Sequence, residues 1–216
     1  MQKNLKKLFW QDEKDLKILI DLLKQNKVLI SSTDTIYGFL SNTTLDCWSK
    51  IHELKNAPQR RPFLILVSSV EKLSNFVDTT NIPEKIINFV SKCWPGPVTF
   101  IFNAKENLPE FLSSEKNTIA LRCPKHNGLQ KILHEFDGLF STSANESMDA
   151  PPEKFSKINP KLLEQIEAVV LDEPEVINTE PSTIVDFSQD DFSLKIVRQG
   201  AMPEELLKSL FHNIRT

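Results

Sequence analysis

"PVTFIFNAKENLPEFLSSEKNTIALRCP", residues 97–124, contains two strand-like segments, PVTFIFNA and TIALRCP, with no helical pattern between them. A parallel pair of strands usually needs a helix as its crossover, whereas an antiparallel pair can be joined without one. We therefore expect the two segments to pair antiparallel. A sheet with such a pair differs from the purely parallel sheet of a doubly wound fold.

Outward from this pair, helical and strand-like patterns are interleaved, which is typical of the α/β class. Apolar residues at helical spacing predict helices over residues 12–26, 43–55, 82–94, 129–136 and 203–211. Short apolar runs predict further strands over residues 28–31, 63–67, 138–145, 168–173, 182–187 and 194–200. The last three strands crowd together, so we expect antiparallel pairs there too. The predicted fold is a twisted mixed parallel and antiparallel sheet with packed helices.

Composition bounds the class of protein. The chain has 216 residues, which suits a single domain over residues 1–216. No apolar run is long enough to span a bilayer and the N-terminal segment lacks an apolar core, so we predict neither membrane span nor signal peptide. Three cysteines without a CxxC pair predict a reduced, cytoplasmic protein with no metal site. A net charge of −3 argues against a general nucleic-acid coat.

The five glycines have neither the Walker nor the dinucleotide-binding spacing. A bound nucleotide would therefore be held by side chains, through charge and hydrogen bonds. Such side chains gather at predicted strand ends: Thr33, Thr35, Tyr37, Lys55, Arg60, Arg61, Thr118, Arg122, Ser141, Thr142, Ser143, Asn145, Ser182, Thr183 and Arg198. Ligands of open α/β sheets bind where strands end, so these residues predict an anion-binding pocket.

Each polar segment taken alone also has a purely structural interpretation. STDT, residues 32–35, is typical of a turn with hydroxyl caps. STSAN, residues 141–145, fits a helix N-cap as well as it fits a binding site. KNAPQRRP, residues 55–62, reads alone as a solvated basic loop. Arg122 differs, because a charge between apolar strand residues must be paired or face a cavity.

Seven segments in order resemble the motifs of one family. They are SSTDTIYGF (31–39), KNAPQRRPFLILV (55–67), WPGPVTFIF (94–102), TIALRCPKH (118–126), LFSTSANES (139–147), STIVDF (182–187) and IVRQGA (196–201). Together they resemble the YrdC-like family, the threonylcarbamoyl-AMP synthases. The resemblance implies the YrdC-like fold, with a concave basic cleft.

The resemblance also implies a reaction and its partners. A nucleotidyltransferase of this family joins L-threonine, bicarbonate or CO2, and ATP into threonylcarbamoyl-AMP and pyrophosphate. Partner proteins then transfer the threonylcarbamoyl group to tRNA. Magnesium is expected with the ATP phosphates, but its ligands cannot be read from this sequence.

Matching positions carry the family's site residues onto this chain. For L-threonine the resemblance implies Thr33, Thr35, Tyr37, Arg122, Ser143 and Ser182, with Gly38 letting the chain turn away. For ATP it implies Lys55, Arg61, Thr118, Ser141, Asn145 and Arg198. Lys55 and Arg61 are the implied catalytic residues.

One departure from the family motif keeps a second function open. The family carries Lys-x-Arg where this chain has Lys55-Asn56-Ala57, and Arg60 or Arg61, a few residues further on, is a candidate to replace the missing arginine. Arg61 is the better candidate because it matches a position on the ATP side. A paralogous branch also lacks the full motif, so the alternative is a non-synthase module that binds tRNA or ribosomal RNA directly. The retained Lys55 and Ser143-Ala144-Asn145 favour the synthase.

Overall fold

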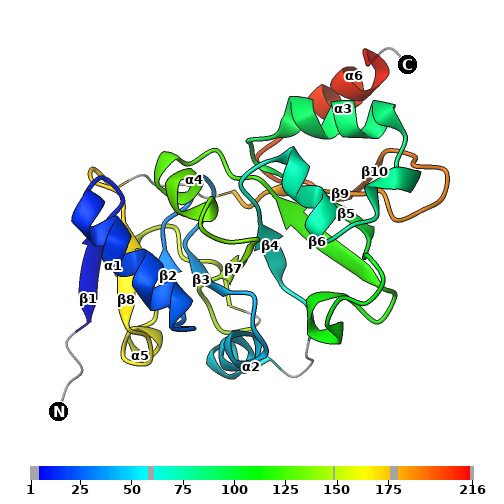
Figure 1. Cartoon of the computed structure of the whole chain (residues 1–216). Coiled ribbons are helices and arrows are strands. Elements are labelled where there is room, and N and C mark those ends of the chain that lie inside the picture. The colour runs from blue at the N-terminus through cyan, green and yellow to red at the C-terminus, as the bar shows by residue number, and fades with distance from the viewer. Residues whose placement is uncertain (1–4, 58–60, 148, 176–179, 215–216) are drawn as a thin grey trace.

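The protein, described from a computed structural model over residues 5–57, 61–147, 149–175 and 180–214, is built on one sheet. Its strands have the order β1-β8-β2-β3-β7-β4-β6-β5-β9-β10 (Figure 1). They are β1 (Lys6–Phe9), β2 (Leu29–Ser31), β3 (Gly38–Asn42), β4 (Leu64–Leu66), β5 (Val98–Asn103), β6 (Thr118–Arg122), β7 (Leu139–Ser143), β8 (Ala168–Leu171), β9 (Thr183–Asp186) and β10 (Lys195–Arg198).

The helices are α1 (Glu13–Lys24), α2 (Leu45–Leu54), α3 (Glu84–Cys93), α4 (Asn127–Leu133), α5 (Pro160–Leu163) and α6 (Glu204–His212). Four short 3-10 helices are η1 (Val70–Asn75), η2 (Thr79–Asn81), η3 (Glu110–Leu112) and η4 (Phe155–Lys157). No helix in the described part of the chain has the length and apolar character needed to cross a membrane.

Strand directions confirm a mixed sheet. β5 and β6 pair antiparallel, as the missing helix between them predicts. β9 and β10 also pair antiparallel, whereas β5 pairs parallel with β9 and β4 parallel with β6. The expectation of antiparallel pairing for all the late strands is wrong for β8, which pairs parallel with β1 and β2 at the other end of the sheet. Sequence proximity does not fix a strand's neighbours, because a connection can cross the sheet.

Two strands were not predicted from the sequence. β1 is a short edge strand with two lysines, so it has no apolar run to reveal it. β3 starts at Gly38, which the resemblance assigned to a chain turn. In the structure Gly38 lies in the sheet, and a Cβ there would come within 2.9 Å of the Thr142 carbonyl oxygen. Glycine is therefore required for the close approach of β3 to β7 and not for a turn.

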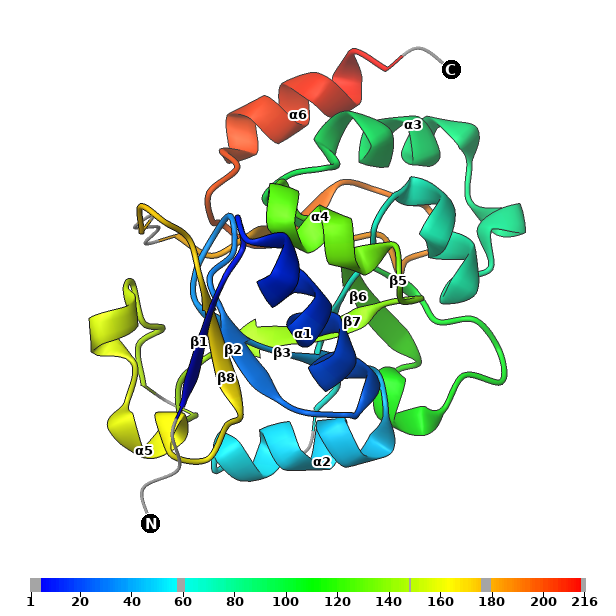
Figure 2. The same cartoon turned by 60° about the vertical axis from the view of Figure 1, so that its left-hand side comes forward.

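Helices cover the two faces of the sheet unequally. α1 and α4 pack on one face, here called the α1–α4 face, where their leucines meet Leu29, Leu40, Leu66, Leu139 and Val170 (Figure 2). On the opposite face, α2, α3 and α6 share a second cluster with aromatic residues of β3, β5 and β7. The two clusters form because side chains alternate between faces along each strand.

β6 presents polar and small side chains on the α1–α4 face, beyond the reach of the helical cluster. Leu66 of that cluster pairs with Arg122 at the end of β6, so both side chains lie on this face. By alternation, Thr118 and Ala120 share the face with Arg122. Neither Thr118 nor Ala120 belongs to a hydrophobic cluster, and both are partly exposed. The fold therefore leaves this part of the sheet open to a ligand.

The start of α2 supplies a direct test of the local structure. The Cys47 amide donates to Thr44 Oγ1 over 3.4 Å, which makes Thr44 the N-cap of α2. We expect Thr44→Ala to lower the free energy of unfolding in urea by about 0.5–1 kcal/mol, because one helical donor loses its acceptor. Thr43→Ala is the matched control, with an expected loss below about 0.5 kcal/mol. Equal losses for the two variants would contradict the assigned cap.

Candidate active site

Arg122 is the buried centre of a group of hydrogen-bonded polar residues, here called the Arg122 cluster. It is 3% exposed and ends β6. Its Nε donates to the Gly96 carbonyl oxygen over 3.1 Å, Nη1 donates to Thr35 Oγ1 over 2.9 Å, and Nη2 donates to Asp34 Oδ1 over 2.6 Å. Burial lowers the pKa of Arg122, and the negative charge of Asp34 opposes that effect. The prediction that this charge must be paired or face a cavity is confirmed.

The loop after β2 extends the Arg122 cluster through hydroxyl groups. Thr35 Oγ1 lies 3.1 Å from Thr33 Oγ1, which also accepts from the Thr35 amide over 3.0 Å. Thr33 Oγ1 in turn donates to the Ile36 carbonyl oxygen over 2.8 Å. Thr33, Thr35 and Arg122 thus form one hydrogen-bonded network, with the two threonines held by the turn that STDT makes.

Ser182 and Arg198 lie beside this network. Ser182 Oγ is 2.8 Å from Thr99 Oγ1. Phe100 of β5 pairs with Leu121 of β6, so the preceding residue, Thr99, lies opposite Arg122. Arg198 Nη2 donates to the Ser182 carbonyl oxygen over 2.8 Å. Burial lowers the pKa of Arg198, and repulsion by Arg122 lowers it further. Two arginines close enough to repel each other favour an anionic ligand between or beside them.

Lys55 connects a second group of polar residues, here called the Lys55 cluster, at the end of β7. Its Nζ donates to the carbonyl oxygens of Ser143 and Asn145 over 2.8 and 2.9 Å, and lies 3.3 Å from Asn145 Oδ1. Burial lowers the pKa of Lys55 to about 8. The Ala144 amide donates to the Tyr37 carbonyl oxygen over 3.0 Å, which connects this cluster to the loop that carries Thr33 and Thr35.

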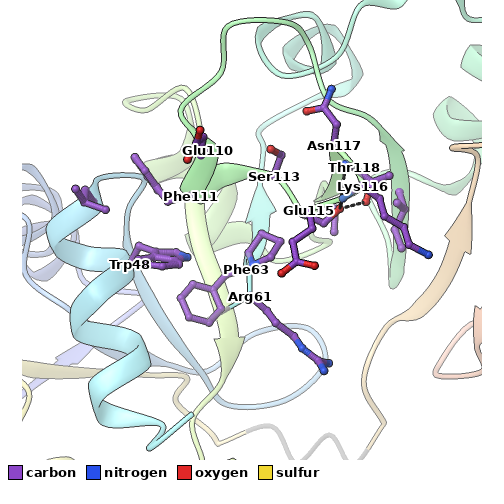
Figure 3. A pocket seen from close by; sticks show the side chains of 15 residues that line it. Trp48, Arg61, Phe63, Glu110, Phe111, Ser113, Glu115, Lys116, Asn117 and Thr118 are labelled. Carbon is purple, nitrogen blue, oxygen red and sulfur yellow. Dashed lines mark hydrogen bonds between the residues drawn. The ribbon is translucent and has the colours of Figure 1, made fainter. Parts of the chain in front are cut away.

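A cavity of about 1570 Å³ opens at the start of β6, the opposite end of the strand from Arg122 (Figure 3). Its wall includes the aromatic rings of Trp48, Phe63 and Phe111, and Arg61 and Thr118 also line it. Figure 3 shows the rings on one side and the Ser113–Thr118 segment on the other. Thr118 and Ala120 line the cavity on the same face of β6 as Arg122. The cavity therefore reaches along this face of β6 as far as Ala120, two residues or about 7 Å from Arg122.

Several predicted site residues lie outside these contacts or outside the described residues. Tyr37 is buried in the core with its hydroxyl donating to Glu175 Oε1 over 2.6 Å, and burial, together with that contact, raises the pKa of Tyr37. Ser141 is nearly buried on β7, two residues before Ser143 and on the same face. Arg60 lies outside the residues that the structure describes. The Arg61 carbonyl oxygen is 2.9 Å from His52 Nε2, which ties its main chain to α2.

The structure also reveals residues that the sequence analysis did not include in the site. Asp34 pairs with Arg122, Thr99 contacts Ser182, and Trp48 and Phe111 form part of the cavity wall. Asp34 was visible within STDT as an acid between two threonines. Nothing in the sequence marks Trp48 or Phe111, because an aromatic residue on a helix or in a loop is more often core than ligand wall.

Magnesium finds no ready site among the side chains that the structure describes. In residues 5–57, 61–147, 149–175 and 180–214, no three or more His, Cys, Asp or Glu side chains come together as metal ligands do. Magnesium bound through nucleotide phosphates needs few protein ligands, so it can arrive with the ATP substrate.

Comparison with known proteins relates these features to a family. The model of the Sua5, YciO and YrdC proteins, described as "Telomere recombination", matches residues 21–200. The threonylcarbamoyl-AMP synthase of Histophilus somni is 31% identical over 185 residues, which cover 84% of this chain and 97% of that protein.

Two solved structures share the fold. P. abyssi Sua5 complexed with L-threonine matches with a TM-score of 0.83 and 24% identity, over 98% of this chain and 62% of that one. E. coli YciO matches with a TM-score of 0.75 and 18% identity, over 92% of this chain and 96% of its own. With the family match over residues 21–200 and the fold shared with both structures, this chain belongs to the Sua5/YciO/YrdC family.

Proposed function

We propose that the protein is a threonylcarbamoyl-AMP synthase, a cytoplasmic nucleotidyltransferase that joins L-threonine, bicarbonate or CO2, and ATP. The observation that carries the proposal is the Thr33–Thr35–Arg122 network on the same face of β6 as the large cavity. The name of the H. somni relative and the L-threonine in the P. abyssi Sua5 structure support it. Separate partner proteins would carry the threonylcarbamoyl group to tRNA.

L-Threonine would bind at the Arg122 end of this surface. An arginine has five N–H groups, and Arg122 uses three of them within the described part of the chain. The other two suit the substrate carboxylate, since a guanidinium recognises a carboxylate through paired donors. Thr33, Thr35 and Ser182 would add hydroxyl contacts, and Ser143 would face the substrate from β7. Tyr37 would support this wall from the core.

ATP would bind from the cavity toward Arg122. The cavity is large enough for a nucleoside triphosphate, and its aromatic rings offer flat apolar surface for a base. Thr118, Ser141 and Asn145 would donate hydrogen bonds to the nucleotide. Lys55, Arg61 and Arg198 would neutralise the phosphates, with magnesium brought by the ATP.

The reaction needs placement and charge neutralisation more than a nucleophilic side chain. The threonine amine first adds to CO2 and becomes a carbamate. A carbamate oxygen then attacks the α-phosphorus, and the bond from that phosphorus to the β-phosphate bridge breaks, so pyrophosphate leaves with the negative charge. Holding both substrates on one strand face supplies proximity, and Lys55 and Arg61 stabilise the charge on the departing pyrophosphate.

Pyrophosphate release from ATP and bicarbonate, with and without L-threonine, tests the proposed function. A synthase releases pyrophosphate only when threonine is present. If the protein releases none under either condition, the synthase proposal fails in favour of the RNA-binding alternative. A rise in melting temperature with duplex RNA, and none with ATP plus threonine, would then support that alternative.

Conservative changes at the two arginines should separate the two substrates. Arg122→Lys keeps the charge but removes the guanidinium fork, so we expect the KM for threonine to rise about ten-fold while the KM for ATP changes less than about two-fold. Arg198→Lys is the matched control and should mainly raise the KM for ATP. Steady-state pyrophosphate release at varied threonine and varied ATP measures both. Equal effects of Arg122→Lys on the two KM values would contradict its role.

Arg61 should compensate for the alanine at position 57. Arg61→Ala is expected to lower kcat/KM for ATP about ten-fold, which corresponds to about 1.4 kcal/mol of lost charge-assisted bonding. Ala57→Arg, which restores the family motif, should recover part of that activity in the Arg61→Ala background. Lys116→Ala removes another cation that lines the cavity and should have a smaller effect. Full activity of Arg61→Ala would show that Arg61 does not compensate.

The lowered pKa of Lys55 predicts a pH limb. With a pKa of about 8, Lys55 loses its charge as the pH rises through that value, so phosphate neutralisation weakens. We expect kcat/KM for ATP to fall above about pH 8 relative to Lys55→Arg, whose guanidinium stays charged. The ratio of the two profiles from about pH 7 to about pH 9.5 removes the effect of substrate ionisation. A constant ratio would show that Lys55 is not responsible.

A further inference from the structure

We propose that Asp34 is a positioning residue that fixes the Arg122 guanidinium for the carboxylate of the amino-acid substrate. The inference rests on the proposed function, because it assumes that Arg122 receives this carboxylate. Asp34 would act through Arg122 and not by touching the substrate.

Both carboxylate oxygens of Asp34 have a partner. Oδ1 accepts from Arg122 Nη2 over 2.6 Å, and Oδ2 accepts from the Lys125 amide over 2.8 Å. Lys125 follows β6 by three residues, so Asp34 clamps the loop after β2 to both the side chain and the main chain at the end of β6. A neutral amide cannot replace it, because an amide has one acceptor oxygen where the clamp uses two.

The contacts of Arg122 leave its guanidinium no freedom to rotate. Asp34, Thr35 and Gly96 hold one N–H on each of its three nitrogens. The guanidinium plane is therefore set by three points from two separate segments. The N–H groups left for a ligand keep a fixed direction, which is the condition for selective carboxylate binding.

Charge gives Asp34 a second effect on the same arginine. The side chains of Arg122 and Asp34 are only 4% and 12% exposed, so an unpaired Arg122 would be a costly buried cation. Arg198 adds a second positive charge. It lies close enough to Arg122 that repulsion between the two arginines adds to the effect of burial in lowering the pKa of Arg198. With Asp34 present, the pair of arginines carries one net positive charge, which a single carboxylate balances. Without Asp34, the two arginines carry two net positive charges, and we expect them to attract other small anions as well.

Asp172 provides a matched control. It is also a largely buried acid that contacts a basic side chain, because Asp172 Oδ1 lies 3.1 Å from His126 Nε2 and its side chain is 12% exposed. Asp172 contacts neither Arg122 nor Thr35 among the described residues. A general loss of packing should therefore affect Asp34→Asn and Asp172→Asn alike, whereas a positioning role belongs to Asp34 alone.

The test measures binding of L-threonine by calorimetry to the wild-type protein, Asp34→Asn and Asp172→Asn, with and without acetate. We expect Asp34→Asn to weaken threonine binding at least about ten-fold and to make it sensitive to acetate. The wild-type protein and Asp172→Asn should bind threonine within about two-fold of each other and ignore acetate. Unchanged threonine binding by Asp34→Asn, or equal weakening in both variants, overturns the proposal.

A second variant covers the case in which Asp34→Asn does not fold. Asp34→Glu keeps both carboxylate oxygens and the charge, but its longer side chain moves the acceptors away from Arg122 Nη2 and the Lys125 amide. It should weaken threonine binding about three-fold or more, and wild-type affinity would overturn the proposal. Because binding is measured without turnover, the result is separate from the proposed function. A wild-type protein that binds threonine but releases no pyrophosphate would contradict only the synthase reaction.

Discussion

A positive charge buried at the end of a strand determines how the parts of this site meet. Arg122 is 3% exposed, and leaving a buried charge unpaired costs about 3–5 kcal/mol, a large share of the net stability of a folded domain. Its partners come from the loop after β2 and from the turn before β5, which lie far from β6 in the sequence. Satisfying one charge therefore brings three segments of the chain to one point. Thr33 and Thr35 reach the site with the loop after β2, and Ser182 reaches it through its contact with Thr99 of β5.

Because helices cover the sheet unevenly, part of the sheet face that carries Arg122 stays open. α1 and α4 pack their leucines against the strands from β1 to β4, and the same face of β6 keeps small or polar residues. The cavity forms where that open face meets the aromatic residues of α2 and η3. A chain without glycine-rich phosphate loops thus still offers a nucleotide-sized site, built from side chains on strands and at strand ends.

Burial makes the charged forms of the cations at this surface less favourable than they are in water. Burial lowers the pKa of Lys55, Arg122 and Arg198. Each of them donates to neutral carbonyl or hydroxyl groups, and Arg122 alone of the three also donates to Asp34. Such a site is less stable without an anion than with one, which is typical of functional sites. The alanine at position 57 removes one cation that the family motif would supply. Arg61 lies on the cavity wall, and we propose that it makes up for this loss.

Much of the fold could be read from the sequence. The helical periods marked α1, α2, α3, α4 and α6, and the lack of a helix between β5 and β6 correctly indicated an antiparallel pair in a mixed sheet. These features depend on local patterns of apolar residues, which the sequence displays directly. The same holds for Arg122, whose position between apolar residues already required a partner. The family motifs supplied the proposed roles of the other site residues.

Long-range packing decided the rest. β1 and β3 form only because β8, β2 and β7 provide pairing partners, and no local pattern announces them. Gly38 is needed for a close approach of two strands that are a hundred residues apart in the sequence. Asp34 and the cavity aromatics Trp48 and Phe111 gain their places through contacts across the sheet. A sequence fixes the propensities and the charges that must be paired, but only the folded chain shows which distant groups pair with them.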